Sequence, residues 1–193
     1  NPGYKVLRKE RKLGHRTNDT AHVLFEDMRV PERDVLGPPG RGLGIALANL
    51  SAGRIGVAAQ ATGGARAALK AAHDYAKTRE TFGRPIVEHQ AIAFMLAEMA
   101  TEIEAARQLY LYAARLKSAG QDCAREASMA KLFASEMAER VASKAIQIHG
   151  GYGFLNDYCV EKIYRDVRVY QIYEGTSEIQ KIVISRALND LEL

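Results

Sequence analysis

The feature that most constrains the fold is a run of apolar residues spaced alternately by four and three positions. These residues are Ile92, Leu96, Met99, Ile103, Ala106, Tyr110 and Ala113. Heptad spacing places such side chains along one face of a helix, and it is typical of helices that pack side by side in a bundle. A further apolar stripe consists of Ala130, Phe133, Met137, Val141, Ala145 and Ile148. The sequence therefore predicts two long helices that pack through these stripes.

A third long helix is predicted from Gly42 to about Lys77, where Ala, Leu and Ile predominate. This segment contains four internal glycines: Gly53, Gly56, Gly63 and Gly64. Each internal glycine costs a helix about 1 kcal/mol relative to alanine. We therefore expect another part of the chain to pack closely against this helix.

Shorter helices are expected toward the C-terminus. Gly150 and Gly151 should end the preceding long helix, as glycines at a helix C-terminus commonly do. A helical piece is predicted near residues 157–167, and a last helix follows Ser177. Ser177 and Gln180 have the spacing of a capping box at the start of that helix.

The N-terminal part of the chain has a different pattern. β-Branched and apolar residues at 4–8 and 21–30 predict short strands, and the Pro- and Gly-rich stretch 35–40 predicts a domain boundary. We expect an all-α fold, an up-and-down four-helix bundle with additional C-terminal helices, preceded by a short β-strand tail. The predicted domains are residues 1–37 and 38–193.

Composition excludes several classes of function. The formal net charge is +4, but residues 1–16 hold six basic residues against one acidic residue, so the remainder is not basic and nucleic-acid binding is not expected. Cys123 and Cys159 lack the spacing of a metal site or a disulfide framework, which favours a reducing compartment. No run of about 18 apolar residues is apparent, so no membrane span is expected. The stretch Gly40–Gly44 lacks the ending and the βαβ setting of a phosphate-binding loop.

One carboxylate stands out as a possible catalytic base. Glu174 follows the apolar and aromatic residues Ile172 and Tyr173, and it lies on the loop just before the last predicted helix. Proton-abstracting bases are often placed in such partly apolar surroundings. An isolated acidic residue on a loop is nevertheless most often a solvated surface charge, so the residue alone does not define a site.

Several motifs in the same order resemble those of the acyl-CoA dehydrogenase family. Residues 173–180, YEGTSEIQ, are similar to a signature near the C-terminus of that family. Residues 147–154 resemble its Gln-x-x-Gly-Gly-x-Gly stretch, and residues 79–86 resemble its Arg-x-x-Phe-Gly stretch. Residues 11–17 and 23–31 are similar to the end of its middle β-domain, which makes residues 1–37 the expected remnant of that domain. The resemblance covers nearly the whole chain, and it implies a fragment of a longer enzyme that is inactive alone.

The resemblance implies a reaction and a catalytic residue. Glu174 would remove the α-proton of an acyl-CoA thioester while a hydride passes from the β-carbon to FAD, which gives a trans-2-enoyl-CoA. Arg54 and Gly175 would contact the substrate. Some branches of the family place the base on the long helix, at the position of Gly53 or its neighbour. No carboxylate is present there, which favours a short- or medium-chain type of site. The resemblance implies no metal ion.

The resemblance also assigns residues to FAD. The matching positions are Arg79, Thr81, Phe82, His89, Gln90, Gln147, Gly150, Gly151, Thr176 and Glu178. In the family, the contacts from residues 79–90 reach a FAD held mainly by the neighbouring subunit, which implies a homodimer or homotetramer. Electron-transfer flavoprotein is the implied electron acceptor in fatty acid β-oxidation. The cytoplasm of a bacterium and the mitochondrial matrix are both compatible locations.

Two other readings remain open at this stage. The same scaffold could serve an acyl-CoA oxidase or a dehydrogenase of an unusual CoA thioester. Consumption of oxygen without a flavoprotein acceptor would identify the oxidase. The bundle could alternatively be an oligomerisation module without a cofactor. Flavin absorbance in the purified protein would argue against that second reading.

Overall fold

A computed structural model describes residues 1–189, in which helices predominate. The chain divides into two compact units, Asn1–Leu50 and Ser51–Leu193. The predicted helical domain runs to residue 193, and its last four residues lie outside the described part. The assignment of residues 1–37 to a β-domain stays a prediction.

The N-terminal unit contains the two predicted strands, but the second is shorter than expected. β1 (Tyr4–Lys9) pairs antiparallel with β2 (Ala21–Phe25), with Tyr4 opposite Phe25. The prediction of a strand over 21–30 was wrong beyond Phe25. Asp27 adopts a left-handed backbone conformation with φ of 46°, which ends the extended conformation that a strand requires. A short 3-10 helix, η1 (Glu32–Asp34), follows.

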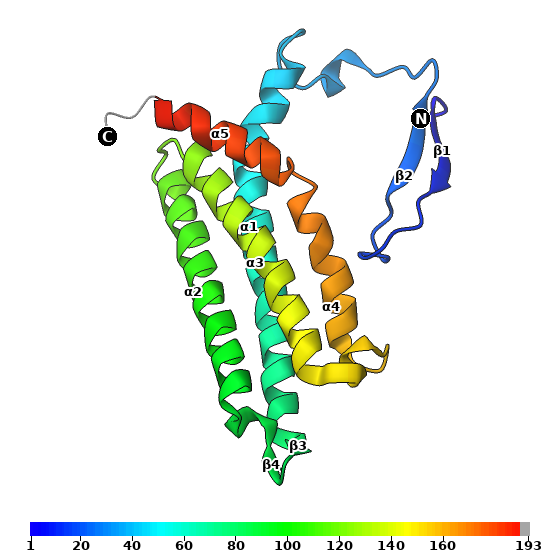
Figure 1. The fold of residues 1–193 in the computed structure, drawn as a ribbon. Coiled ribbons are helices and arrows are strands. Elements are labelled where there is room, and N and C mark those ends of the chain that lie inside the picture. Colours follow the sequence, from blue (N-terminus) through cyan, green and yellow to red (C-terminus); the bar gives the residue numbers. More distant parts are fainter. Residues whose placement is uncertain (190–193) are drawn as a thin grey trace. The chain divides into compact units, whose positions relative to one another are not determined.

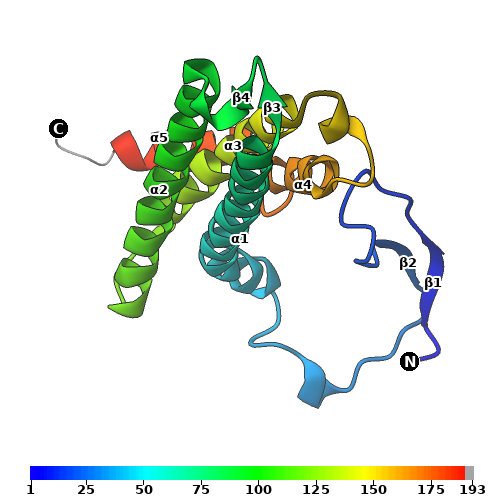
Figure 2. The same ribbon diagram turned by 90° about the horizontal axis from the view of Figure 1, so that it is seen from below.

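The second unit is built on the three predicted long helices, the first of which begins before Ser51. These are α1 (Gly42–Thr78), α2 (Gln90–Ser118) and α3 (Ala124–His149). They lie side by side, with the shorter α4 (Cys159–Val167) running along α3 (Figures 1 and 2). α5 (Ser177–Asn189) packs against α3 at one end of the bundle. The all-α bundle with additional C-terminal helices was correctly predicted.

Short connecting elements occupy the opposite end of the bundle (Figure 1). β3 (Glu80–Thr81) and β4 (Arg84–Pro85) form a small hairpin, which leads into the 3-10 helix η2 (Ile86–Glu88). As predicted, α3 ends at the double glycine, where Gly150 has a positive φ of 60°. The chain then forms η3 (Gly150–Phe154), and a fourth 3-10 helix, η4 (Arg168–Gln171), follows α4.

The core confirms both predicted stripes. Leu96, Met99, Ile103 and Ala106 of α2 are buried, as are Ala130, Met137, Val141, Ala145 and Ile148 of α3, whereas Phe133 is partly buried. α1 contributes mainly alanines, and Ala58, Ala61, Ala65, Ala68, Ala72 and Ala76 are completely buried. Side chains this small allow neighbouring helices to approach closely. A Cβ added to Gly64 would lie 3.3 Å from Val167, which accounts for a glycine at that position.

α1 differs from the sequence expectation in one respect. It contains a stretch that is long and apolar enough to cross a membrane by length and composition, and 17% of that stretch is buried. No such run was expected. A single helix of this kind is weak evidence for a membrane span, because the core helices of bundles can pass the same test.

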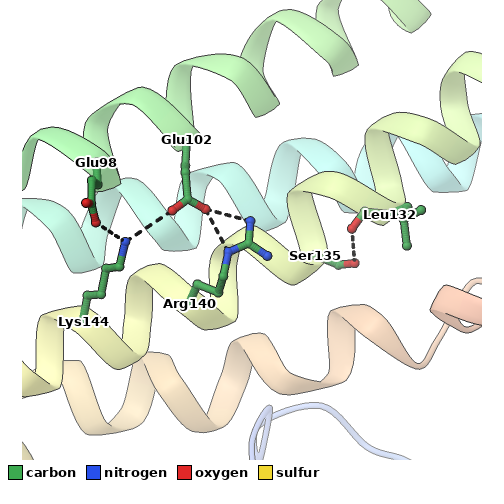
Figure 3. Close-up of polar contacts among 6 residues, drawn as sticks. All are labelled: Glu98, Glu102, Leu132, Ser135, Arg140 and Lys144. Atoms are coloured by element: carbon green, nitrogen blue, oxygen red, sulfur yellow. Dashed lines mark hydrogen bonds and ion pairs between the residues drawn. The ribbon is translucent and has the colours of Figure 1, made fainter. Parts of the chain in front are cut away.

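Ion pairs join α2 to α3 along their exposed sides (Figure 3). Arg140 donates through two nitrogens to one carboxylate oxygen of Glu102, at 2.9 and 2.7 Å. Lys144 donates to Glu98 at 2.9 Å and to Glu102 at 3.4 Å. These hydrogen bonds raise the pKa of Lys144, so the lysine remains charged. Because the pairs are partly solvated, each should contribute at most about 1 kcal/mol.

The core and the ion pairs should therefore respond differently to mutation. Met137 has no exposed surface, so Met137→Ala should lower the free energy of unfolding by about 2–5 kcal/mol. Met137→Leu, which nearly conserves volume, should cost less than about 1.5 kcal/mol. Glu98→Ala removes one solvated ion pair and should cost less than about 1 kcal/mol. Chemical denaturation of the three variants measures this order, and an equal loss in Met137→Ala and Glu98→Ala would contradict the packing described here.

Candidate active site

The residues singled out from the sequence fall into two groups at opposite ends of the bundle. One group surrounds the turn before α5 and consists of Arg54, Glu174, Gly175, Thr176 and Glu178. The other surrounds the β3–β4 hairpin and η3 and consists of Arg79, Thr81, Phe82, His89, Gln90, Gln147, Gly150 and Gly151. Along α1, residues 54 and 78 are about 36 Å apart, at 1.5 Å per residue. The first group is called the Glu174 site below, and the second the hairpin site.

The Glu174 site is built on a backbone turn of unusual conformation. Glu174 has a φ of 55° and Gly175 a φ of 89°, both in the left-handed region. A residue other than glycine seldom adopts such a value, and it persists only where the surroundings hold it. The Gln180 side-chain nitrogen donates to the carbonyls of Glu174, at 3.1 Å, and Gly175, at 2.8 Å. The Lys131 ammonium donates to the same Gly175 carbonyl at 2.6 Å.

The turn directs the Glu174 carboxylate against α1 at Gly53. A Cβ built on Gly53 would lie 2.8 Å from the Glu174 Cδ, which is closer than real side chains approach one another. Glu174 is only half-buried, so one side of the carboxylate remains accessible. Glycine at position 53 is therefore the condition for this placement of the acid. The close approach expected at the internal glycines of α1 is found here and at Gly64.

A buried arginine lies beside the carboxylate. Arg54 is 6% exposed, and its Nη1 donates to the Ser128 hydroxyl at 3.1 Å. That hydroxyl donates in turn to the Ala124 carbonyl at 2.7 Å, which fixes its orientation. Burial lowers the pKa of Arg54, and the negative charge of Glu174 acts in the opposite direction. A guanidinium nevertheless stays protonated at any ordinary pH, so Arg54 provides a fixed positive charge.

The start of α5 corrects the predicted capping box. Thr176 is the capping residue, because its carbonyl accepts from the Gln180 amide at 3.0 Å and its hydroxyl accepts from the Ile179 amide at 3.5 Å. Ser177 is the first helical residue, and its buried hydroxyl has no hydrogen-bond partner among the described residues. Gln180 does not reach back to the helix terminus. Its side-chain nitrogen instead donates to the carbonyls of Glu174 and Gly175.

Glu178 lies on the exposed side of the helix start. Its own backbone N–H and the Thr176 hydroxyl lower the pKa of its carboxyl group. The group is therefore an anion at neutral pH. A helix N-terminus with one carboxylate already bound can still offer backbone N–H groups to a second anion, but Glu178 would oppose that anion unless a cation also takes part.

Two tyrosines border the same site. Tyr173 donates its hydroxyl to the Gln60 side chain at 2.8 Å, which ties the turn to α1. Its ring stacks on that of Tyr170, with centroids 5.9 Å apart. Burial raises the pKa of both phenols, so both are neutral and the approach to Glu174 is largely apolar.

The hairpin site contains a cavity of about 470 Å³. Of the predicted residues, Arg79, Thr81, Gly150 and Gly151 line it. Sequence reasoning did not single out its aromatic lining, which consists of Tyr75, His149 and Tyr152. The Arg79 guanidinium lies 5.9 Å from the Tyr152 ring centroid and makes no ion pair within the described residues. His149 stacks on Tyr75 at 4.3 Å between centroids and hydrogen-bonds the Ala145 carbonyl through Nδ1 at 2.8 Å.

His89 organises the hairpin beside this cavity. Arg84 lies 3.2 Å from His89 Nδ1, and because a guanidinium can only donate, Nδ1 must accept. The proton then lies on Nε2, which is 3.2 Å from the Thr81 carbonyl and 3.0 Å from its hydroxyl. Phe82 at the hairpin tip is 97% exposed, with a φ of 51°. Gln90 and Gln147 are exposed and line no described cavity.

Lys131 is the main residue that sequence reasoning missed. It lies beside the apolar stripe of α3, and no motif marks it, yet its amine contacts the Glu174 turn. In residues 1–189, no group of three or more His, Cys, Asp or Glu side chains could hold a metal ion.

Comparison with known families agrees with the motifs. Residues 40–189 match the family model described as acyl-CoA dehydrogenase, C-terminal domain. The chain belongs to the acyl-CoA dehydrogenase family. The match includes α1 and every later helix, and thus both the Glu174 site and the hairpin site.

Individual relatives and a solved structure are similar over nearly the whole chain. An acyl-CoA dehydrogenase of Bacillus subtilis is 54% identical over 97% of the chain and 49% of its own length. The CarC subunit of the caffeyl-CoA reductase-Etf complex of Acetobacterium woodii is 46% identical over 96% of the chain and 49% of its own length. The structure of butyryl-CoA dehydrogenase from Megasphaera elsdenii superimposes with a TM-score of 0.96 at 46% identity, covering 97% of this chain and 49% of that one. The chain thus spans about half the length of the relatives it matches.

The contact between Gly53 and Glu174 generates a prediction about this acyl-CoA dehydrogenase domain. Gly56 is the matched control, because a Cβ there would meet nothing within 4 Å. Gly56→Ala should raise the free energy of unfolding by up to about 1 kcal/mol through helix propensity. Gly53→Ala should gain less, because its Cβ displaces the Glu174 carboxylate. Denaturation of both variants and a crystal structure of Gly53→Ala measure this difference; an equal gain with an unmoved carboxylate would show that the site tolerates a side chain at position 53.

Proposed function

We propose that the protein carries out the FAD-dependent α,β-dehydrogenation of acyl-CoA thioesters to trans-2-enoyl-CoA products, with Glu174 as the base. The observation that carries this proposal is the position of the Glu174 carboxylate, which lies in a strained and doubly held turn against Gly53. Energy stored in a backbone conformation of this kind often accompanies a functional constraint. The half-buried carboxylate has one open side from which a thioester could approach.

The surroundings of Glu174 suit the removal of a proton from carbon. Arg54 is a fixed buried cation beside it, and the neutral rings of Tyr170 and Tyr173 keep the approach apolar. Loss of the α-proton places negative charge on the thioester oxygen, which requires hydrogen-bond donors. In the part of the chain that the structure describes, the backbone N–H of Glu174 donates no hydrogen bond and is free to act as one such donor.

The residues of the hairpin site fit part of FAD. Arg79 offers an unpaired guanidinium to a pyrophosphate, the Thr81 hydroxyl a further polar contact, and Gly150 and Gly151 an approach without side chains. The aromatic walls of the cavity suit a nucleotide base. Bound FAD would supply the hydride acceptor for the reaction. Phe82, His89, Gln90 and Gln147 are proposed as further contacts at the same end of the bundle.

The separation of the two sites supports a homo-oligomer. Thr176 and Glu178 belong to the Glu174 site, whereas the hairpin site lies about 36 Å away along α1. A single FAD is too short to contact both. We infer that each subunit contacts two FAD molecules, one through each site, in a homodimer or homotetramer.

The names of two relatives indicate a class of acyl-CoA substrate and an electron-transfer partner. Butyryl-CoA dehydrogenase bears a name that specifies a short acyl chain, and CarC is named as a subunit of a complex with Etf. We infer a preference for short acyl-CoA thioesters and electron transfer to an electron-transfer flavoprotein, in a bacterial cytoplasm or the mitochondrial matrix. Gly175, next to the base, and Arg54 are proposed to contact the substrate.

The first test concerns the base. In the whole protein, Glu174→Gln should lower the rate of dehydrogenation by at least about 10²–10⁴-fold, because it removes the proton acceptor with little change in shape. FAD content should be unchanged. Glu104→Gln, on the exposed side of α2, is the matched control and should keep full activity. Steady-state assays with butyryl-CoA and an artificial electron acceptor measure this, and retained turnover in Glu174→Gln would exclude Glu174 as the base.

The second test concerns FAD. Arg79→Gln should reduce the flavin content of the purified whole protein, because the guanidinium available to a pyrophosphate is lost. Arg115→Gln, near the end of α2 and away from the cavity, is the control and should bind flavin normally. The ratio of flavin absorbance to protein absorbance gives the result directly. A colourless wild-type protein would instead support the alternative of a bundle that only mediates oligomerisation, and oxygen consumption without a flavoprotein acceptor would support an oxidase.

A further inference from the structure

Lys131 is a buried ionisable group that the proposed chemistry does not use. It is the largest of the described side chains with virtually no solvent exposure, and it projects from the middle of α3. Burial lowers the pKa of its amine to about 8. Burying an ammonium group is costly in a protein interior unless it is paired or hydrogen-bonded. The compensation here comes from the Glu174 turn.

The amine shares the turn with Gln180. Lys131 Nζ and Gln180 Nε2 both donate to the Gly175 carbonyl, at 2.6 and 2.8 Å, and so use both lone pairs of that oxygen. One donor comes from α3 and the other from α5. Two consecutive residues with positive φ are therefore held from two helices. Removal of one donor should loosen the turn without removing it.

The charge of the Lys131 amine also interacts with the charged side chains of the Glu174 site. Arg54 on α1 repels its positive charge, whereas Glu174 in the turn, Glu178 on α5 and Glu136 on α3 attract it. Lys131 and Arg54 thus present two positive charges to one catalytic carboxylate.

We propose that Lys131 is a positioning residue of the dehydrogenase, which holds the Glu174–Gly175 turn by a hydrogen bond and adds a positive charge to the surroundings of the Glu174 carboxylate. This inference rests on the proposed function of Glu174. It assigns two separable contributions to one amine: a hydrogen bond to the Gly175 carbonyl and a positive charge. Three substitutions separate them, since Lys131→Met removes both, Lys131→Gln retains a donor without charge, and Lys131→Arg retains the charge.

The test measures kcat, KM and flavin content of the whole, FAD-loaded protein between pH 5.5 and about 10. Lys131→Met should lower kcat at least about tenfold with little change in KM or flavin content, because the substrate contacts remain. Lys131→Gln should show a smaller loss of kcat, because it retains a donor, and Lys131→Arg should keep most of the wild-type kcat, because it retains both a donor and the charge.

The alkaline limb gives a second readout that a purely structural role would not change. Loss of the Lys131 proton near pH 8 should reduce wild-type activity above that pH. This fall should be absent in Lys131→Gln and should move to higher pH in Lys131→Arg. Lys144→Met is the matched control, because Lys144 lies on the same helix but pairs with α2. It should keep the wild-type kcat and the wild-type alkaline limb.

Stability provides an independent check on the burial of the charge. The folded-state pKa of Lys131 lies below its ordinary value of 10.5, so the folded protein loses this proton before the unfolded chain does. Its contribution to stability is therefore least favourable below pH 8 and improves as pH rises from about 8 to 10.5. The melting temperature of wild type relative to Lys131→Met should rise over that interval. A constant difference would overturn the assignment of a buried charge.

The outcomes distinguish this inference from the proposed function. If Glu174→Gln is inactive while all three Lys131 variants keep the wild-type kcat and pH profile, only the role of Lys131 is wrong. If Glu174→Gln retains activity, the proposed base is wrong and the inference fails with it. Loss of folded or flavin-loaded protein in all three Lys131 variants would show that the lysine serves the fold alone.

Discussion

The structure depends on a glycine that lets a carboxylate lie against a helix. Gly53 has no side chain, so the Glu174 carboxylate can occupy the space where a Cβ would stand. The long helix α1 would gain stability from alanine at that position. The helix instead has a glycine, which is a poorer helix former than alanine. The absence of a side chain there allows the Glu174 carboxylate to occupy its position.

That placement is maintained by charges and donors that would be unfavourable elsewhere. Arg54 and Lys131 are both buried cations, and their mutual repulsion is offset by the carboxylates around them. The Arg54 Nε, the Ser177 hydroxyl and the Gln180 Oε1 are buried without a partner among the described residues. Unsatisfied buried groups usually cost stability. Their concentration around one turn is what a site that favours function over stability should show.

The sequence predicted the parts of the fold that follow from a periodic residue pattern or a local signal. The stripes through Met99 and Met137 were recognised because burial recurs every three or four residues, and the double glycine at 150 and 151 marked a helix end. Lys131 could not be recognised, because it lies outside the apolar stripe of α3 and its partner lies 44 positions away. The capping box failed for a different reason. Gln180 has the right spacing for a local hydrogen bond, but the strained turn nearby competes for its side chain.

The two sites also differ in how complete they are within one chain. The Glu174 site is enclosed by α1, α3, α5 and the turn itself, and its contacts are made by residues of the same unit. The hairpin site ends in Phe82, an apolar side chain that is almost fully exposed. Exposing an aromatic ring at the tip of a hairpin has no benefit for an isolated bundle. A cofactor whose other half is held by a second subunit would cover that ring, and it would also pair the free guanidinium of Arg79 beside it.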